Sequence, residues 1–135
     1  MKRPSILIAN DDSIFADGIY ALWEAMSDIG ETTVVAPNTE KSAVGHAITV
    51  SEPIRIEKVN RSGGFRGYAM NGTPADSVKI AVKAIMDKKP DIIISGINAG
   101  ANIGQSLLYS GTISAATEGT FLGIPSIAIS LDSIR

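Results

Sequence analysis

Short apolar runs that alternate with amphipathic stretches constrain the fold of this chain more than any other feature of its sequence. The run at residues 5–9 has polar neighbours on both sides, which is typical of a strand buried on both faces of a parallel sheet. Apolar residues then recur with the helical period from about 17 to 28, and Gly30 follows them. Residues 32–36 predict a second strand, closed by Pro37, so this part of the chain predicts a β-α-β unit.

The rest of the sequence continues this alternation after one interruption. Residues 48–59, which alternate in places, and residues 65–70 flank a Ser-Gly-Gly turn and predict an inserted β-hairpin. Thr73 and Pro74 are suited to begin a helix, which apolar residues continue as far as Met86. We then expect a strand at 91–95, a loop rich in Gly and Asn at 96–111, a helix at 112–121 and a strand at 126–130.

This order of elements predicts an α/β fold. We expect a Rossmann-like, doubly wound and mostly parallel sheet with an inserted β-hairpin, formed by residues 1–135 as a single domain. Ligands bind at the carboxyl ends of the strands in such sheets. Polar clusters follow three of the predicted strands, so the functional residues are expected in three loops, at 10–13, 38–46 and 96–112.

Composition argues against several classes of protein. The 135 residues include no cysteine, so neither a disulfide framework nor a thiolate nucleophile is expected. The formal net charge of −2 gives no support for binding to duplex nucleic acid or to an anionic membrane surface. No apolar run approaches the roughly 20 residues of a membrane span, and the first apolar run is too short for a signal peptide. We therefore expect a cytoplasmic protein.

Asp11 and Asp12 form a pair of carboxylates directly after the first predicted strand. Two adjacent acids repel one another unless a cation lies beside them. Their oxygens suit Mg²⁺, Mn²⁺ or Ca²⁺, and an amide oxygen of Asn98 and the hydroxyl of Ser42 could complete the ligands. Such an ion would assist hydrolysis of a phosphomonoester. The pair alone is equally typical of a solvated turn or a helix cap.

The segment from Ser95 to Asn102 and the segment from Ser110 to Thr112 predict a phosphate site. Glycines in the first segment allow the backbone to approach a ligand closely. Ser110, Gly111 and Thr112 begin a helix, where free N–H groups and two hydroxyls favour an anion. Taken alone, these three residues are more typical of an ordinary helix cap. A glycine-rich dinucleotide fingerprint and a P-loop are both absent from the sequence.

Five segments, in this order along the chain, resemble the SurE family of stationary-phase survival proteins. The segments lie over nearly the whole chain, and together they are far more specific than any one of them. They are Asn10-Asp11-Asp12; Ala36-Pro37 with Ser42 and Gly45; Gly72-Thr73-Pro74-Ala75-Asp76; Ser95 to Asn102; and Tyr109-Ser110-Gly111-Thr112 with Ala115-Ala116 and Glu118-Gly119.

The resemblance implies a metal-dependent 5′/3′-nucleotidase that cleaves nucleoside monophosphates, and in some members short polyphosphate. It implies one divalent cation per subunit, Mg²⁺ or Mn²⁺, and a homodimer or homotetramer for the full-length protein. Asp11 and Asp12 are the implied catalytic residues. The implied metal ligands are Asp11, Asp12, Ser42 and Asn98, and the implied phosphate-binding residues are Asn102, Ser110, Gly111 and Thr112.

Two departures from the family pattern stand beside the resemblance. Ser13 replaces the usual glycine of the first motif, which would strain the loop if that position needs positive φ. Family members are also longer, so we expect a C-terminally truncated SurE fold, the N-terminal part of a longer chain. One alternative is a fragment that binds metal and phosphate without turnover. Another is a receiver-like signalling domain, which would need a phospho-accepting aspartate where Ser95 and Gly96 end the third strand.

Overall fold

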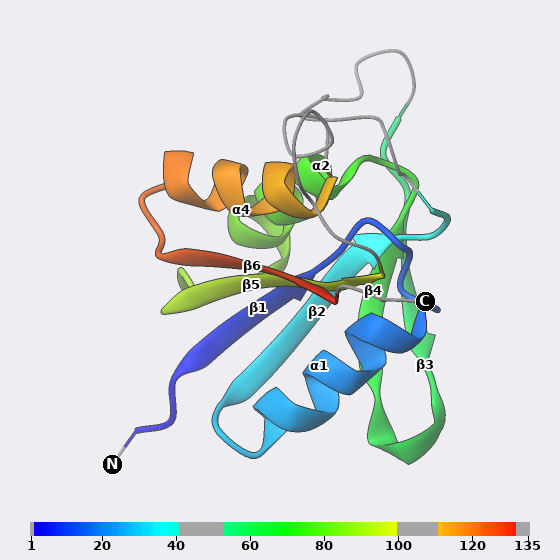
Figure 1. Cartoon of the computed structure of the whole chain (residues 1–135). Coiled ribbons are helices and arrows are strands. Elements are labelled where there is room, and N and C mark those ends of the chain that lie inside the picture. Colours follow the sequence, from blue (N-terminus) through cyan, green and yellow to red (C-terminus); the bar gives the residue numbers. More distant parts are fainter. Residues whose placement is uncertain (1, 41–52, 100–110, 132–135) are drawn as a thin grey trace.

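The computed structural model describes residues 2–40, 53–99 and 111–131, which form an α/β fold with a six-stranded sheet (Figure 1). The strands lie in the order β3-β4-β2-β1-β5-β6. Their bounds are β1 Ser5–Ala9, β2 Glu31–Pro37, β3 Ile56–Asn60, β4 Arg66–Met70, β5 Ile92–Ala99 and β6 Ser126–Leu131. The helical segments are α1 Asp17–Ser27, η1 Ser62–Gly64, α2 Pro74–Ile80, η2 Ala81–Ile85 and α4 Gly111–Phe121.

The sheet is mostly parallel, as the sequence predicts. Strand β1 pairs in parallel with β2 on one side and with β5 on the other, and β6 extends the sheet beyond β5. Strand β4 pairs in parallel with β2 and antiparallel with β3, which confirms the inserted hairpin. The carboxyl ends of β1 and β5 therefore lie at the same end of the sheet.

Helices cover both faces of the sheet (Figure 1). Helix α1 packs on one face, where Ile6, Ile8 and Val34 join Ile19 and Leu22 in a buried cluster. Helices α2 and α4 lie over the other face, where the buried cluster includes Leu7, Val35, Val78 and Ala115. Successive residues of β1 thus point to opposite clusters, and this two-sided burial explains its continuous apolar run.

The start of α2 shows how local sequence sets an element boundary near the site. The hydroxyl Oγ1 of Thr73 accepts a hydrogen bond of 3.1 Å from the backbone N–H of Asp76. In return, Oδ2 of Asp76 accepts one of 2.9 Å from the backbone N–H of Thr73. This capping box contributes about 1 kcal/mol, and Pro74 occupies the first helical position as predicted.

Two predicted boundaries are wrong. Strand β5 continues to Ala99, so the predicted loop at 96–111 begins later than expected. The reason is β6, which pairs with Asn98 and Ala99 after a register shift and thereby extends the ladder. The predicted single helix up to Met86 is also interrupted, because α2 passes into the π-helical turn η2 at Ala81. Its apolar face still packs on the sheet.

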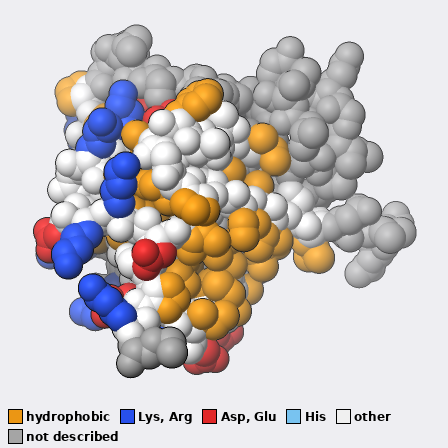
Figure 2. Space-filling model, turned by 90° about the vertical axis from the view of Figure 1, so that its left-hand side faces the viewer, with side chains coloured by type: hydrophobic (Ala, Val, Ile, Leu, Met, Phe, Trp, Pro, Cys, Tyr) orange, Lys and Arg blue, Asp and Glu red, His pale blue; other side chains and the backbone are white. Residues whose placement is uncertain are grey.

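The α1 side of β6 has no helix over it in the ranges that the structure describes (Figure 1). Ile127 and Leu131 on this strand are 46% and 62% exposed. Figure 2 shows hydrophobic side chains gathered on the face of the molecule turned toward the viewer.

None of the described helices is both long and apolar enough to cross a membrane.

Candidate metal and phosphate site

Asp11 and Thr112 meet at the edge where the parallel strands end. Asp11 follows β1, and Thr112 is the second residue of α4. The hydroxyl Oγ1 of Thr112 donates a hydrogen bond of 2.8 Å to Oδ1 of Asp11, across 101 positions of sequence. Both side chains are buried, with Asp11 only 4% exposed. The first predicted carboxylate and the start of the predicted anion-binding helix are therefore in direct contact.

Asp12 links the same loop to the end of β5. Its Oδ2 atom accepts a hydrogen bond of 3.1 Å from the backbone N–H of Ala99. Ala99 directly follows Asn98, the predicted amide ligand, which is 8% exposed. The register shift in β5 lies between Ser95 and Asn98, so the irregular part of the strand comes just before this contact. The acid pair thus contacts the end of β5 and the start of α4.

Gly111 allows the helix to approach the acid pair this closely. A Cβ atom built on Gly111 would lie 2.6 Å from Cβ of Asp11 and 2.9 Å from Cγ of Pro74. No real side chain tolerates such contacts without moving its neighbours, so this position needs glycine. Because Gly111 has no side chain, the start of α4 lies beside Asp11. The first backbone N–H groups of this helix have no carbonyl partner within it and so remain available to an anion.

Burial raises the pKa of Asp11 above its ordinary value of 3.8, and the neighbouring charge of Asp12 raises it further. The hydrogen bond from Thr112 opposes this shift because it favours the charged form. The environment thus disfavours a lone negative charge at Asp11. A bound cation would reverse that preference.

The described residues fit a divalent cation that prefers oxygen ligands. No three acidic side chains in the described part of the chain form a cluster that could hold a metal ion, so Asp11 and Asp12 would need neutral oxygen ligands to complete a site. Asn98 supplies an amide next to the residue that Asp12 contacts. Carboxylate and amide oxygens suit Mg²⁺ and Mn²⁺, and Mg²⁺ usually retains several waters beside one or two carboxylates.

The loop after the acid pair is shaped by Ser13. Its φ of 95° lies in the left-handed region, which costs a non-glycine residue about 1 kcal/mol. Its hydroxyl accepts a hydrogen bond of 3.0 Å from the N–H of Phe15, which offsets a similar amount. The amide Nδ2 of the buried Asn10 donates a hydrogen bond of 2.8 Å to the carbonyl of Ser13. The strain expected from serine is therefore present and locally compensated.

Arg61, which follows β3 in the inserted hairpin, stabilises the far end of the loop that follows β1. Its Nη1 atom donates hydrogen bonds of 3.0 Å and 2.9 Å to the carbonyl oxygens of Ile14 and Ala16. The guanidinium lies over the rings of Tyr20 and Phe65, 4.9 Å and 5.3 Å from their centroids. The hairpin therefore holds the end of the loop that begins with the acid pair.

The structure brings five of the predicted site residues to this edge: Asp11, Asp12, Asn98, Gly111 and Thr112. Ser42, Asn102 and Ser110 lie outside the described residues. The sequence placed Asn10 in the first motif but gave it no role, and it gave no sign of Arg61; both donate to backbone carbonyls. No motif marks such contacts.

Comparison with known proteins gives a consistent family. The model of the family described as "Survival protein SurE" matches residues 6–135. A "5'-nucleotidase SurE" of Syntrophobacter fumaroxidans is 54% identical over 130 residues, which cover 96% of this chain and 52% of that protein. A protein of the same name from Syntrophus aciditrophicus is 51% identical over 129 residues, covering 96% of this chain and 48% of that protein.

A solved structure supports the same relationship. The crystal structure of the SurE protein from Aquifex aeolicus superposes with a TM-score of 0.87 at 45% sequence identity. The match covers 98% of this chain and 52% of that one. The chain therefore spans about half the length of the relatives it matches.

Proposed function

Because the chain belongs to the SurE family, we propose that it is the N-terminal part of a metal-dependent nucleotidase that hydrolyses nucleoside monophosphates. The observation that carries the proposal is the hydrogen bond between Asp11 and Thr112, which joins the acid pair to the start of α4. Relatives that are 54% and 51% identical are named 5'-nucleotidases. The fit of the described residues to an oxygen-ligated cation supports the same reaction class.

In this proposal Asp11, Asp12, Ser42 and Asn98 hold one Mg²⁺ or Mn²⁺ ion per subunit. The ion, when bound, supplies Lewis acidity that polarises the phosphoryl group and lowers the pKa of a water molecule. Asp11 and Asp12 are the catalytic carboxylates because they position this chemistry at the strand ends. We further propose that the complete protein is a homodimer or homotetramer and also accepts short polyphosphate.

The phosphate would lie at the start of α4, held by Asn102, Ser110, Gly111 and Thr112. The hydroxyl of Thr112 already donates to Asp11, so this side chain would position the carboxylate rather than bind substrate. The backbone N–H groups of Gly111 and Thr112 would then contact the phosphate, with the positive end of the helix dipole behind them. The proposed roles at this helix are thereby divided between side chain and backbone.

A receiver-like signalling domain fits the described residues less well. It requires a phospho-accepting carboxylate at the carboxyl end of β5, where Asn98 and Ala99 lie. Asp91 precedes that strand at the other edge of the sheet, where its Oδ2 atom accepts a hydrogen bond of 2.8 Å from the N–H of Ser5. An acyl phosphate at Asp91 would therefore be remote from the acid pair.

Phosphate release from a panel of nucleoside monophosphates, with Mg²⁺ or Mn²⁺ and with EDTA, tests the proposal. The assay should compare this chain with a full-length relative, and calorimetry should measure metal binding separately. Asp11→Asn and Asn98→Ala should abolish metal binding and turnover, whereas Asp28→Asn, an exposed acid at the end of α1, should leave both unchanged.

Turnover that survives EDTA and Asp11→Asn would refute the metal-dependent mechanism. Metal binding without turnover in this chain, alongside turnover in the full-length relative, would favour the alternative in which these residues bind metal and phosphate only. This second candidate, binding without turnover, is favoured by the fact that the chain covers only 52% of the relative from Syntrophobacter fumaroxidans.

A further inference from the structure

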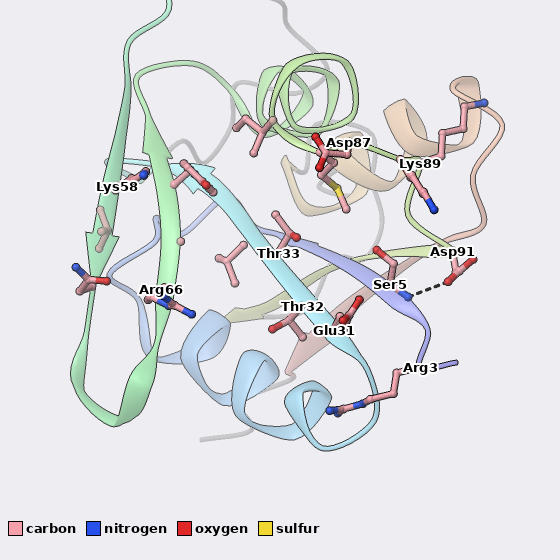
Figure 3. Close-up of a pocket in the computed structure, with 18 of the residues that line it drawn as sticks. Arg3, Ser5, Glu31, Thr32, Thr33, Lys58, Arg66, Asp87, Lys89 and Asp91 are labelled. Atoms are coloured by element: carbon pink, nitrogen blue, oxygen red, sulfur yellow. Dashed lines mark hydrogen bonds between the residues drawn. The ribbon is translucent and has the colours of Figure 1, made fainter. Parts of the chain in front are cut away.

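A cavity lies at the opposite end of the strands from the acid pair (Figure 3). It has a volume of about 960 Å³ and is lined by the first residues of β1, β2 and β4, with the segment after η2 as its far wall. Because these three strands are parallel, their first residues and the proposed catalytic loops lie at opposite ends. No residue of the proposed metal and phosphate site lines this cavity.

Cations are concentrated around this cavity. Its lining includes six of the 12 Lys and Arg residues of a chain whose formal net charge is −2, but only three of its 14 acidic residues. The basic residues are Lys2, Arg3, Lys58, Arg66, Lys88 and Lys89, and the acidic ones are Glu31, Asp87 and Asp91. The cavity is thus basic on an acidic molecule.

Lys58 and Arg66 form the least compensated part of this charge. They lie on neighbouring strands and on one face, since Lys58 pairs with Tyr68 and Arg66 pairs with Asn60. Neither makes an ion pair or a hydrogen bond with another residue of the described ranges. Like charges at such diagonal positions repel one another. By contrast, Arg3 and Lys89 donate to backbone carbonyls, at 2.6 Å to Ser27 and 3.1 Å to Leu122.

Protection of a sheet edge accounts for only one of the two cations. Lysine commonly blunts an edge strand, and β3, which carries Lys58, is such a strand. Arg66 lies on β4, which is not an edge strand; it pairs with Asn60 of β3, and the pairing of β4 with β2 begins two residues later, at Tyr68. Edge protection therefore does not account for Arg66, and an anionic ligand would.

Hydrogen-bond donors complete the same surface. Tyr68 lies on the same face of the sheet as the two cations, opposite Lys58 and two residues from Arg66. Val35 of β2 pairs with Tyr68 and so shares this face. Thr33, two residues before Val35, therefore lies on it as well. Figure 3 shows Lys58 and Arg66 on one side of the cavity, and Glu31, Asp87 and Asp91 toward the other. One side of the cavity therefore offers Lys58 and Arg66, and the other carries the three carboxylates together with Arg3 and Lys89.

We propose that this cavity binds a phosphorylated, hydroxyl-bearing small molecule, with its phosphate at Lys58 and Arg66. A phosphomonoester carries nearly two negative charges and three acceptor oxygens, which match two cations with two hydroxyls better than a carboxylate does. The volume exceeds that of phosphate alone and reaches the upper range of small-molecule sites. Glu31 and Asp87 would accept hydrogen bonds from hydroxyls of the organic part. The site is independent of the proposed nucleotidase reaction.

Binding of ribose 5-phosphate, a nucleoside monophosphate and inorganic phosphate to this chain, measured by calorimetry in EDTA, tests the proposal. EDTA removes divalent cations and so prevents any metal-dependent binding at the acid pair. At least one of the two esters should bind saturably, and Lys58→Gln/Arg66→Gln should weaken binding at least about tenfold. A matched pair of charge removals outside the cavity, Arg55→Gln/Lys83→Gln, and Asp11→Asn should leave binding within about twofold of the parent.

Binding of both esters would assign the phosphate and sugar as the recognised groups, and binding of the nucleotide alone would add the base. Several results would overturn the proposal. These are no saturable binding, equal affinity for inorganic phosphate, equal loss in the two double variants, or loss in Asp11→Asn. In protein NMR, amide shifts on ligand addition should be largest at Thr33 and Tyr68; shifts centred on Asp11 would also refute the site.

Discussion

Arg61 provides a direct test of how the inserted hairpin supports the acid-pair loop. Its Nη1 atom donates to the carbonyl oxygens of Ile14 and Ala16, and its guanidinium stacks on two aromatic rings. Arg61→Gln shortens the side chain and removes the charge, so both hydrogen bonds and both ring contacts are lost. We expect the variant to fold, with a less stable and less ordered loop.

The contacts of Arg61 set the expected magnitude. A hydrogen bond from a charged donor contributes about 1.5–3 kcal/mol, and a cation over a ring about 0.5–1 kcal/mol at an exposed site. Both hydrogen bonds are only partly buried, so water replaces part of what is lost. We therefore expect Arg61→Gln to lower the free energy of unfolding by about 2–3 kcal/mol, which is a large share of a typical domain's stability.

Urea denaturation with a fixed m-value measures this loss, and titration with Mn²⁺ reports the loop itself. Arg66→Gln is the matched control, because Arg66 lies on the same hairpin without a described partner and should change stability by less than about 0.5 kcal/mol. Arg61→Lys keeps a charge but loses the planar stack, so it should be intermediate. If the stability of Arg61→Gln is within about 0.5 kcal/mol of the parent, or if the control loses as much, the contacts of Arg61 do not stabilise this loop.

Three further substitutions test the site around Asp11. Because burial raises its pKa above 3.8, the native state holds that proton more tightly than the unfolded state, and metal-free stability falls as pH rises through the interval above 3.8. Asp11→Asn should remove this fall, so urea denaturation without metal should find it more stable than the parent at neutral pH. Thr112→Val removes the 2.8 Å hydrogen bond to Asp11 and should lower the free energy of unfolding by about 1.5–3 kcal/mol. The same substitution should cost less when Asp11 is already asparagine, and equal costs in the two backgrounds would contradict the contact. Gly111→Ala places a Cβ 2.6 Å from Cβ of Asp11 and should cost about 1–3 kcal/mol in thermal unfolding, despite the better helix propensity of alanine.

The sequence predicts the elements whose signals are local. The strand at β1 follows from its unbroken apolar run, and the start of α2 from Thr73, Pro74 and Asp76 within four residues. The Ser-Gly-Gly turn likewise predicts the β3–β4 hairpin, which the structure confirms. The parallel order then follows from general rules of chain connection, and the structure confirms that β1 and β5 are parallel neighbours.

Contacts between distant segments account for what the sequence does not predict. The extension of β5 to Ala99 depends on pairing with β6, about 30 residues later along the chain. The partners of Arg61 lie 47 and 45 positions before it and are backbone carbonyls, which every residue possesses. Thr112 illustrates the same limit: its place in the site was predicted, but its hydrogen bond to Asp11 required the packed structure.

Asp11 connects the stability of this fold to its proposed chemistry. Burying a carboxylate beside a second acid disfavours the folded protein unless the charge is compensated. Thr112 compensates part of it through a hydrogen bond, and the raised pKa shows that burial and Asp12 outweigh this contact. A cation held by the acid pair would remove the remaining penalty, so the same burial that weakens the metal-free fold would strengthen metal binding. Asp11 would therefore contribute both to the proposed metal site and to a pH-dependent part of the free energy of unfolding.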